Sequence, residues 1–133
     1  MKKYLLDTNI CVFFLRGRFE VSNHIGKVGW NNCCISEITV AELLYGAENS
    51  NYIKRNIELV ESFCENIEVI PVSHAIHTYA KEKVRLRKKG TPIEDLDLLI
   101  GATAKAHGFV LVTENFRHLE RIEGLELENW IQR

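Results

Sequence analysis

Short apolar runs alternate with longer segments of helical periodicity along this chain, and this alternation limits the possible folds more than any other feature. The runs that we expect to form strands cover residues 2–7, 33–38, 67–72, 109–114 and 125–130. The segments that we expect to be helical cover residues 8–17, 20–29, 39–65, 74–90 and 91–108, with one helical turn at 116–121. Strands separated by helices favour a parallel sheet covered on both faces. The sequence therefore predicts the α/β class, with a central parallel sheet in a three-layer α/β/α arrangement.

The composition is that of an ordinary globular domain. The chain has 133 residues, of which 46% are hydrophobic and 26% charged, and this suits one domain with one core. The formal net charge is -1, so nucleic-acid binding would have to depend on local patches or on metal ions. The sequence shows no apolar run long enough to span a membrane and no signal-peptide core, and we expect a cytoplasmic protein.

The cysteines and histidines show no recognisable metal motif. Cys11, Cys33, Cys34 and Cys64 form no C-x-x-C pair, and no histidine stands at zinc-finger spacing. We therefore expect reduced, mostly buried thiols. The five histidines form no obvious cluster in the sequence, so neither residue type predicts a site.

Acidic residues at strand ends are more informative, because ligands of parallel α/β sheets bind at the carboxyl ends of the strands. Asp7 directly follows the first predicted strand. It can cap the next helix, since aspartate is a favoured N-cap residue, or it can point into the crevice at the sheet edge. The residue alone does not separate these two roles.

Glu42 also has two readings. The stretch Thr39-Val40-Ala41-Glu42 fits a capping box, in which the glutamate folds back on the N-cap threonine. The same glutamate can instead face the crevice beside Asp7. Spacing alone slightly favours the capping box, although both roles place Glu42 near the strand ends.

Asp97 is the sharpest anomaly, because it lies in the apolar stretch "LDLLIGATAKA". A second capping box, Thr91-Pro92-Ile93-Glu94, predicts that this helix begins at Pro92 and that Asp97 lies beyond the first turn. A carboxylate in so apolar a helix is costly unless something pairs with it. Asp95 is either a fourth acid or a favourable charge near the helix N-terminus, and we favour the second role.

Polar residues flank these acids. Thr8 and Asn9 follow Asp7, and Thr113 and Asn115 lie at the end of the fourth predicted strand. Such side chains can hydrogen-bond a metal-bound water, or they can form the turn. We predict that they support the acidic site.

Three carboxylates drawn to one sheet edge repel one another and raise each other's pKa. A hard divalent cation such as Mg²⁺ or Mn²⁺ removes this cost, since it prefers carboxylate and water oxygens. It also allows the site to accept a phosphate and to activate water. The predicted chemistry is therefore phosphodiester hydrolysis, with Asp7, Glu42 and Asp97 as metal-binding and catalytic acids.

A basic run precedes the Asp97 helix. Its six cationic residues are Lys81, Lys83, Arg85, Arg87, Lys88 and Lys89. A solvated helix face is the commoner meaning of such a run, so it supports a polyanionic partner only weakly. If RNA binds, we expect phosphate contacts and salt-dependent affinity, and the candidate contacts are Arg85, Arg87, Lys88 and Lys89.

Four blocks of the sequence carry a resemblance. "YLLDTNI", "ITVAELLYGA", "GTPIEDLDLLIGATAKAHG" and "LVTENFRHLERIEGLELENW" resemble, in order and spacing, the PIN-domain ribonuclease toxins of the VapC type. The resemblance covers essentially the whole chain and implies a single PIN-like domain over residues 1–133.

The resemblance also implies an activity, partners and site residues. It implies Mg²⁺- or Mn²⁺-dependent endoribonuclease activity on transfer RNA or other structured RNA, leaving a 5′-phosphate and a 3′-hydroxyl. It further implies a homodimer, restraint by a VapB-type antitoxin and no membrane partner. Carried over by position, it assigns the metal to Asp7, Glu42 and Asp97.

One departure from the family concerns the number of ions. Many relatives carry a further acid where this chain has Asn115 or His118, and Glu114 is shifted by one position. We therefore expect one tightly held ion, with a second that arrives only with RNA. The alternative function is a catalytically weak PIN-like module that binds RNA or protein, and metal-dependent cleavage by purified protein would distinguish the two.

Overall fold

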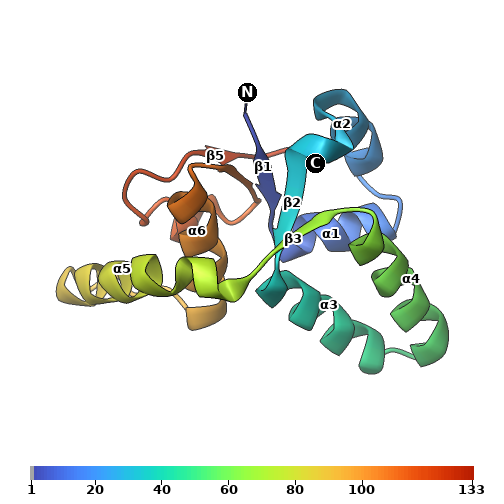
Figure 1. Ribbon diagram of the computed structural model, residues 1–133, viewed down its shortest axis with the longest axis horizontal. Coiled ribbons are helices and arrows are strands. Elements are labelled where there is room, and N and C mark those ends of the chain that lie inside the picture. The colour runs from blue at the N-terminus through green and yellow to red at the C-terminus, as the bar shows by residue number, and fades with distance from the viewer. Residues whose placement is uncertain (1) are drawn as a thin grey trace.

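The computed structural model describes residues 2–133 and is built on a five-stranded sheet (Figure 1). The strands are β1 (Tyr4–Leu6), β2 (Cys33–Ser36), β3 (Glu68–Ile70), β4 (Val110–Val112) and β5 (Leu127–Glu128). Their order is β3-β2-β1-β4-β5, and every neighbouring pair is parallel. The first strand in the sequence therefore lies at the centre of the sheet.

Helices cover both faces of this sheet. They are α1 (Thr8–Leu15), α2 (Val21–Val28), α3 (Glu37–Glu48), α4 (Ile53–Glu65), α5 (Ile76–Lys88), α6 (Asp95–His107) and α7 (Phe116–Leu119), with 3₁₀ turns η1 (Trp30–Asn32) and η2 (Val72–Ala75). In Figure 1, α1 to α4 lie on the right of the sheet and α5 and α6 on the left. None of the helices within residues 2–133 is long and apolar enough to cross a membrane.

Alternation along the strands divides the interior into two cores. Leu6 and Val112, which are paired in register, belong to the core on the α1–α4 side. Leu5 and Leu111 are also paired and belong to the core under α5 and α6. Successive side chains of a strand point to opposite faces, so these short strands contribute to both cores. The predicted three-layer α/β/α fold is confirmed.

Some predicted boundaries were wrong. The helix expected over 39–65 is two helices, because the polar residues 49–52 form a turn that Ser50 closes by donating to the carbonyl of Ala47. Helix α3 begins at Glu37, where the Ser36 side chain accepts from the amide of Ile38. The capping box predicted at Thr39 is therefore wrong, and Thr39 is buried inside the helix.

The second predicted capping box is also wrong. Helix α6 begins at Asp95, and Glu94 stands at the N-cap position without a side-chain cap bond. Ile93 is buried in the same core as Leu86 and Leu98, and this anchor keeps the preceding residues extended. Asp97 consequently lies in the first turn of α6 rather than beyond it.

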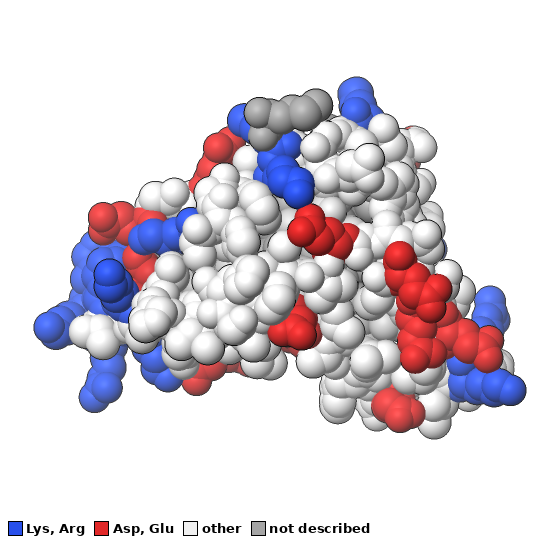
Figure 2. Space-filling model, in the orientation of Figure 1, with Lys and Arg blue, Asp and Glu red and all other residues white. Residues whose placement is uncertain are grey.

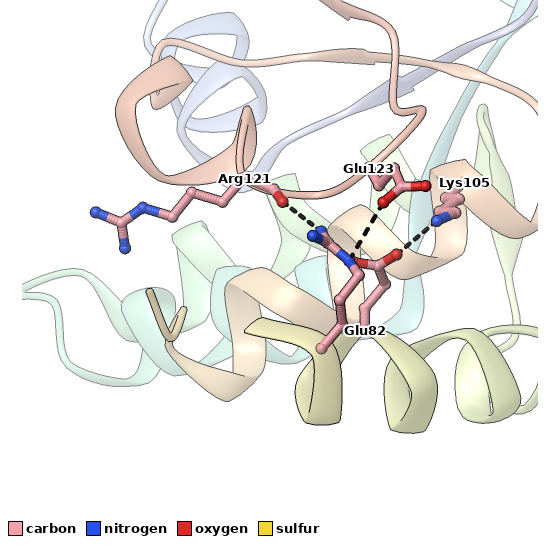
Figure 3. Close-up of polar contacts among 5 residues, drawn as sticks. Glu82, Lys105, Arg121 and Glu123 are labelled. Carbon is pink, nitrogen blue, oxygen red and sulfur yellow. Dashed lines mark hydrogen bonds and ion pairs between the residues drawn. The ribbon is translucent and has the colours of Figure 1, made fainter. Parts of the chain in front are cut away.

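A buried ion-pair cluster fixes α6 against α5 (Figure 3). Glu82 of α5 is 4% exposed and accepts hydrogen bonds from Lys105 of α6, at 2.6 Å, and from Arg85, at 2.7 and 3.0 Å. Arg85 also donates to the carbonyl of Arg121. Burial alone would raise the pKa of Glu82, but these bonds outweigh it and lower the pKa. The cluster therefore ties α6, which carries Asp97, to α5 and to the segment after α7.

The cysteines are as expected. All four are free, and Cys11, Cys33 and Cys34 are buried while Cys64 is half-buried. They pack as small apolar side chains. The predicted burial of most of the thiols is confirmed, and their reduced state remains a prediction.

Candidate active site

Asp7 occupies the end of β1 and takes on both of the roles that its position allows. Its Oδ1 accepts from the amide of Thr8, at 2.8 Å, so it caps α1. Its Oδ2 accepts from the hydroxyl of Thr113, at 2.7 Å, just beyond β4. The side chain is buried, at 7% exposure. Burial raises the pKa of Asp7, and the bonds from Thr113 and Thr8 offset part of that rise.

Glu42 is joined to Asp7 through Thr8. The Thr8 hydroxyl donates to Oε1 of Glu42 at 2.6 Å and lies 3.0 Å from the hydroxyl of Thr39. Because Thr8 has one hydroxyl proton and gives it to Glu42, Thr39 is the donor to Thr8. Thr39 therefore supports the acids instead of capping α3. The sequence pointed to this threonine, but for the wrong role.

Asp97 approaches the same carboxylates from α6. Its pKa is raised to about 6, first by burial and then by the charges of Asp7, Glu94 and Glu42, while His118 lowers it. The charges of Asp7 and Glu42 thus act on Asp97, while the assignment of all three as the acids of one site remains a prediction. Glu94, three residues before Asp97, acts on it as well and was not singled out from the sequence.

The segment after β4 completes the polar surroundings. The Thr113 hydroxyl donates to Asp7 and accepts from the amide of Asn115, at 2.9 Å. Oδ1 of Asn115 lies 2.8 Å from Nδ1 of His118, so a hydrogen bond joins the two side chains. Thr113 and Asn115 are therefore both linked to the acidic cluster.

Other candidates are placed differently. Asn9 is exposed, and no polar side-chain contact within residues 2–133 joins it to the acids. Asp95 accepts from Lys83 and from Tyr79 of α5, at 2.8 Å each. The fourth-acid role for Asp95 therefore has no support. His74 and His107 form a pair, 3.0 Å apart, that the sequence did not indicate, because they meet only through folding.

The four proposed RNA contacts are not equivalent. Arg85 is half-buried and holds Glu82, as described above. Arg87, Lys88 and Lys89 are exposed at the end of α5. Figure 2 shows Lys and Arg side chains gathered over this end of α5, at the left of the molecule. These three residues are therefore available to a polyanion, and Arg85 has a structural role.

The donor set fits a hard divalent cation in its chemistry but is not arranged as a ligand cluster. Within the described part of the chain, no three His, Cys, Asp or Glu side chains converge closely enough to hold a metal ion. Asp7 and Glu42 are instead held by threonine hydroxyls. Without a cation, ionised carboxylates repel one another, and this repulsion adds to burial, the largest cause, in raising the pKa of Asp97. A bound cation would remove this repulsion.

Comparisons with known proteins agree with this description. The PIN domain family model matches residues 4–125. A Salmonella typhimurium protein named tRNA(fMet)-specific endonuclease VapC is 39% identical, over 98% of this chain and 99% of its own length. Ribonuclease VapC2 of Haemophilus influenzae is also 39% identical, over 98% and 100%. The solved structure of DNA-bound VapBC from Salmonella typhimurium has a TM-score of 0.90 at 37% identity, and covers 98% of this chain and 99% of its own.

A parallel sheet with carboxylates at its central strand ends defines the class of protein, and the chain belongs to the PIN-domain family. Within that family it belongs to the VapC ribonucleases, because several VapC proteins match it over nearly their full length. The family predicted from the four sequence blocks is confirmed.

Proposed function

We propose that this chain is a Mg²⁺- or Mn²⁺-dependent endoribonuclease whose acids are Asp7, Glu42 and Asp97. The observation that carries the proposal is the hydrogen-bonded arrangement of Asp7 and Glu42, joined through Thr8 at the end of β1, in a chain that belongs to the VapC ribonucleases. PIN-domain VapC nucleases generally depend on a divalent metal. Burying a carboxylate costs free energy, and buried carboxylates are found where a cation binds them or a reaction uses them.

Each residue has a defined task in this proposal. When bound, the metal supplies charge neutralisation and activation of water. Asp7, Glu42 and Asp97 would hold it through their carboxylate oxygens. Thr113 and Thr8 orient Asp7 and Glu42 by hydrogen bonds of 2.7 and 2.6 Å. Asn115, joined to Thr113, orients water or a phosphate oxygen beside them.

The substrate and partners are inferred from relatives. Two relatives are named tRNA(fMet)-specific endonucleases, and we infer that this chain cleaves transfer RNA. Several solved relatives are VapBC complexes, and we infer that a VapB-type antitoxin restrains this chain and that the toxin forms a homodimer. The exposed Arg87, Lys88 and Lys89 would contact RNA phosphates.

Cleavage of a total transfer-RNA pool tests the proposal. Purified protein with Mg²⁺ or Mn²⁺ should release discrete fragments, and EDTA should prevent their release. Asp97→Asn should abolish cleavage, since it removes one carboxylate ligand. The matched control is Asp95→Asn on the same helix, which should cleave like the wild type because Asp95 binds Lys83 and Tyr79.

Two outcomes would count against this proposal. Equal cleavage by the wild type and Asp97→Asn would show that another site, or a contaminant, does the chemistry. Antitoxin-free protein that binds RNA but cuts neither transfer RNA nor ribosomal RNA would favour the alternative, a catalytically weak binding module.

A further inference from the structure

A cluster of aromatic rings and guanidinium groups joins α1, the loop that follows it and Arg133. The guanidinium carbons of Arg18 and Arg133 lie 5.0 and 5.1 Å from the ring centre of Phe19. The Phe13 ring meets the Phe19 ring edge to face, at 4.8 Å, and Arg133 also lies 5.9 Å from the Phe13 ring centre. We call Arg18, Phe19, Phe13 and Arg133 the arginine–phenylalanine cluster.

The backbone at this cluster is strained. Phe19 and Glu20 have φ angles of 56° and 55°, and no other non-glycine residue in the range 2–133 has a positive φ. A bulky side chain rarely adopts this left-handed conformation. Such strain persists where the surrounding structure imposes it, and it is concentrated at functional sites. Here the strained backbone holds the Phe19 ring between α1 and α2.

Arg133 connects the cluster to the candidate active site. Its Nε and Nη2 donate to the two oxygens of Glu114, at 2.9 and 3.0 Å. Glu114 directly follows Thr113, whose hydroxyl holds Asp7. Phe13 lies on α1, the helix that Asp7 caps. The Arg133–Glu114 ion pair therefore links the cluster to the residue beside Thr113, whereas Phe13 lies toward the opposite end of α1 from Asp7.

The cluster keeps groups available for a ligand. The side chain of Arg133 is 63% exposed, and Glu114 occupies only one edge of its guanidinium. Arg18 is exposed and Phe19 is half-buried. One guanidinium group can bind a phosphate through two parallel N–H···O hydrogen bonds. Unpaired RNA bases stack on aromatic rings and on guanidinium planes.

We propose that the arginine–phenylalanine cluster binds one unpaired nucleotide of the RNA, next to the phosphate held at the carboxylates. Arg133 contacts the phosphate of this nucleotide, and its base stacks on the Arg18 and Phe19 layer. Fixed positive charge here offsets the repulsion between RNA and the three acids. The inference rests on the proposed ribonuclease function and adds a specific RNA-binding subsite to it.

Binding of a short, fluorescent single-stranded RNA, measured by anisotropy in EDTA, tests the subsite without cleavage. Arg133→Gln should weaken binding about tenfold and lower the slope of log affinity against log salt concentration by about 0.7, the value for one phosphate of a single strand. Phe19→Leu should weaken binding roughly tenfold through lost stacking. Phe19→Tyr keeps an aromatic ring and should bind RNA like the wild type. Arg55→Gln, which changes an exposed arginine of α4, should bind like the wild type.

A second RNA and the melting temperatures separate binding from folding. A fully paired RNA of the same sequence should bind with no dependence on Phe19, because its bases are not free to stack. Each variant should melt within a few degrees of the wild type. Unchanged affinity in both Arg133→Gln and Phe19→Leu would overturn the subsite, and so would weaker binding of Arg133→Gln with an unchanged salt slope.

The proposed function and the subsite can fail separately. Wild-type protein that cleaves RNA while these variants bind normally would overturn the subsite alone. Wild-type protein that neither binds nor cleaves RNA would overturn the proposed function itself. Variants that lose an antitoxin complex but keep RNA affinity would assign the cluster to a protein partner and overturn the subsite.

Discussion

The pKa of Asp97 depends on its burial and on the charged residues around it. Its pKa is about 6 in the folded chain, against an ordinary value of 3.8. The folded state therefore binds a proton at Asp97 more tightly than the unfolded state does. This carboxyl destabilises the metal-free protein above about pH 6, and the destabilisation disappears as the pH falls towards the ordinary pKa.

Asp97→Asn should therefore stabilise the metal-free protein at about pH 8. We expect a gain of about 1–2 kcal/mol in the free energy of unfolding, after allowance for solvent screening of a half-buried group. At about pH 4 the gain should vanish, since wild-type Asp97 is then largely protonated. Urea unfolding in EDTA at both pH values measures this gain in the free energy of unfolding.

Asp95→Asn is the control for this effect. Hydrogen bonds from Lys83 and Tyr79 lower the pKa of Asp95, so its removal should give no gain at the higher pH. An equal gain in both variants would mean that general charge reduction, and not the crowding of Asp97, is responsible.

Single residues also show where sequence reasoning succeeds and where it stops. The place of Asp7 at the carboxyl edge of the sheet could be predicted, because parallel strands end at one edge of a sheet, whereas the convergence of Asp7, Glu42 and Asp97 remains a prediction. The hydroxyl link from Thr39 through Thr8 to Glu42 could not, since it depends on how α1 packs on α3. The ion pair of Asp95 with Lys83 likewise forms only when α5 meets α6.

Among the elements, α6 has the most exacting packing. A methyl group added at Gly101 would overlap Cδ1 of Ile122 and lie 3.3 Å from Cδ2 of Leu119. Both side chains are buried, so they have little room to move. The absence of a side chain at Gly101 allows α6 to approach the segment after β4 closely.

Gly101→Ala should therefore lower the free energy of unfolding by roughly 1–3 kcal/mol, despite the better helix propensity of alanine. Gly46→Ala in α3 is the matched control, because nothing lies within 4 Å of the added methyl group. That variant should gain about 0.5–1 kcal/mol. Thermal or urea unfolding distinguishes the two, and equal gains would show that α6 is not closely packed at this point.

Helix ends were easier to predict than helix starts. Gly90 and Gly108 follow α5 and α6 with φ angles of 72° and 70°, and such left-handed positions favour glycine strongly enough to be visible in the sequence. The predicted starts of α3 and α6 were wrong because a capping box is a short pattern that also occurs by chance. Burial of Ile93 and Thr39 decides those starts, and burial depends on the rest of the fold.

At the scale of the whole molecule, the acids connect folding to metal binding. A ligand that binds only the folded state stabilises it in proportion to the logarithm of its concentration. The carboxylates lie on α1, α3 and α6 or at their starts. A cation that they share would therefore join the layers on both sides of the sheet.

Mn²⁺ or Mg²⁺ should accordingly raise the melting temperature of the wild type. A concentration about 100 times the dissociation constant corresponds to about 2.7 kcal/mol. EDTA should reverse the effect, and Asp97→Asn should reduce it strongly. Asp95→Asn should keep the full response. The same metal-induced shift in Asp97→Asn would exclude Asp97 as a ligand.

The central place of β1 has a consequence for how the protein is made. Asp7 precedes its partner Thr113 by 106 positions, and β1 needs both β2 and β4 as neighbours. The chain must therefore be synthesised through β4 before this arrangement of Asp7 can form. A prematurely terminated product that ends before β4 would carry Asp7, Glu42 and Asp97 without the strand and the hydroxyl that hold them in place. The order of the strands thus makes assembly of the candidate active site depend on the synthesis of β4.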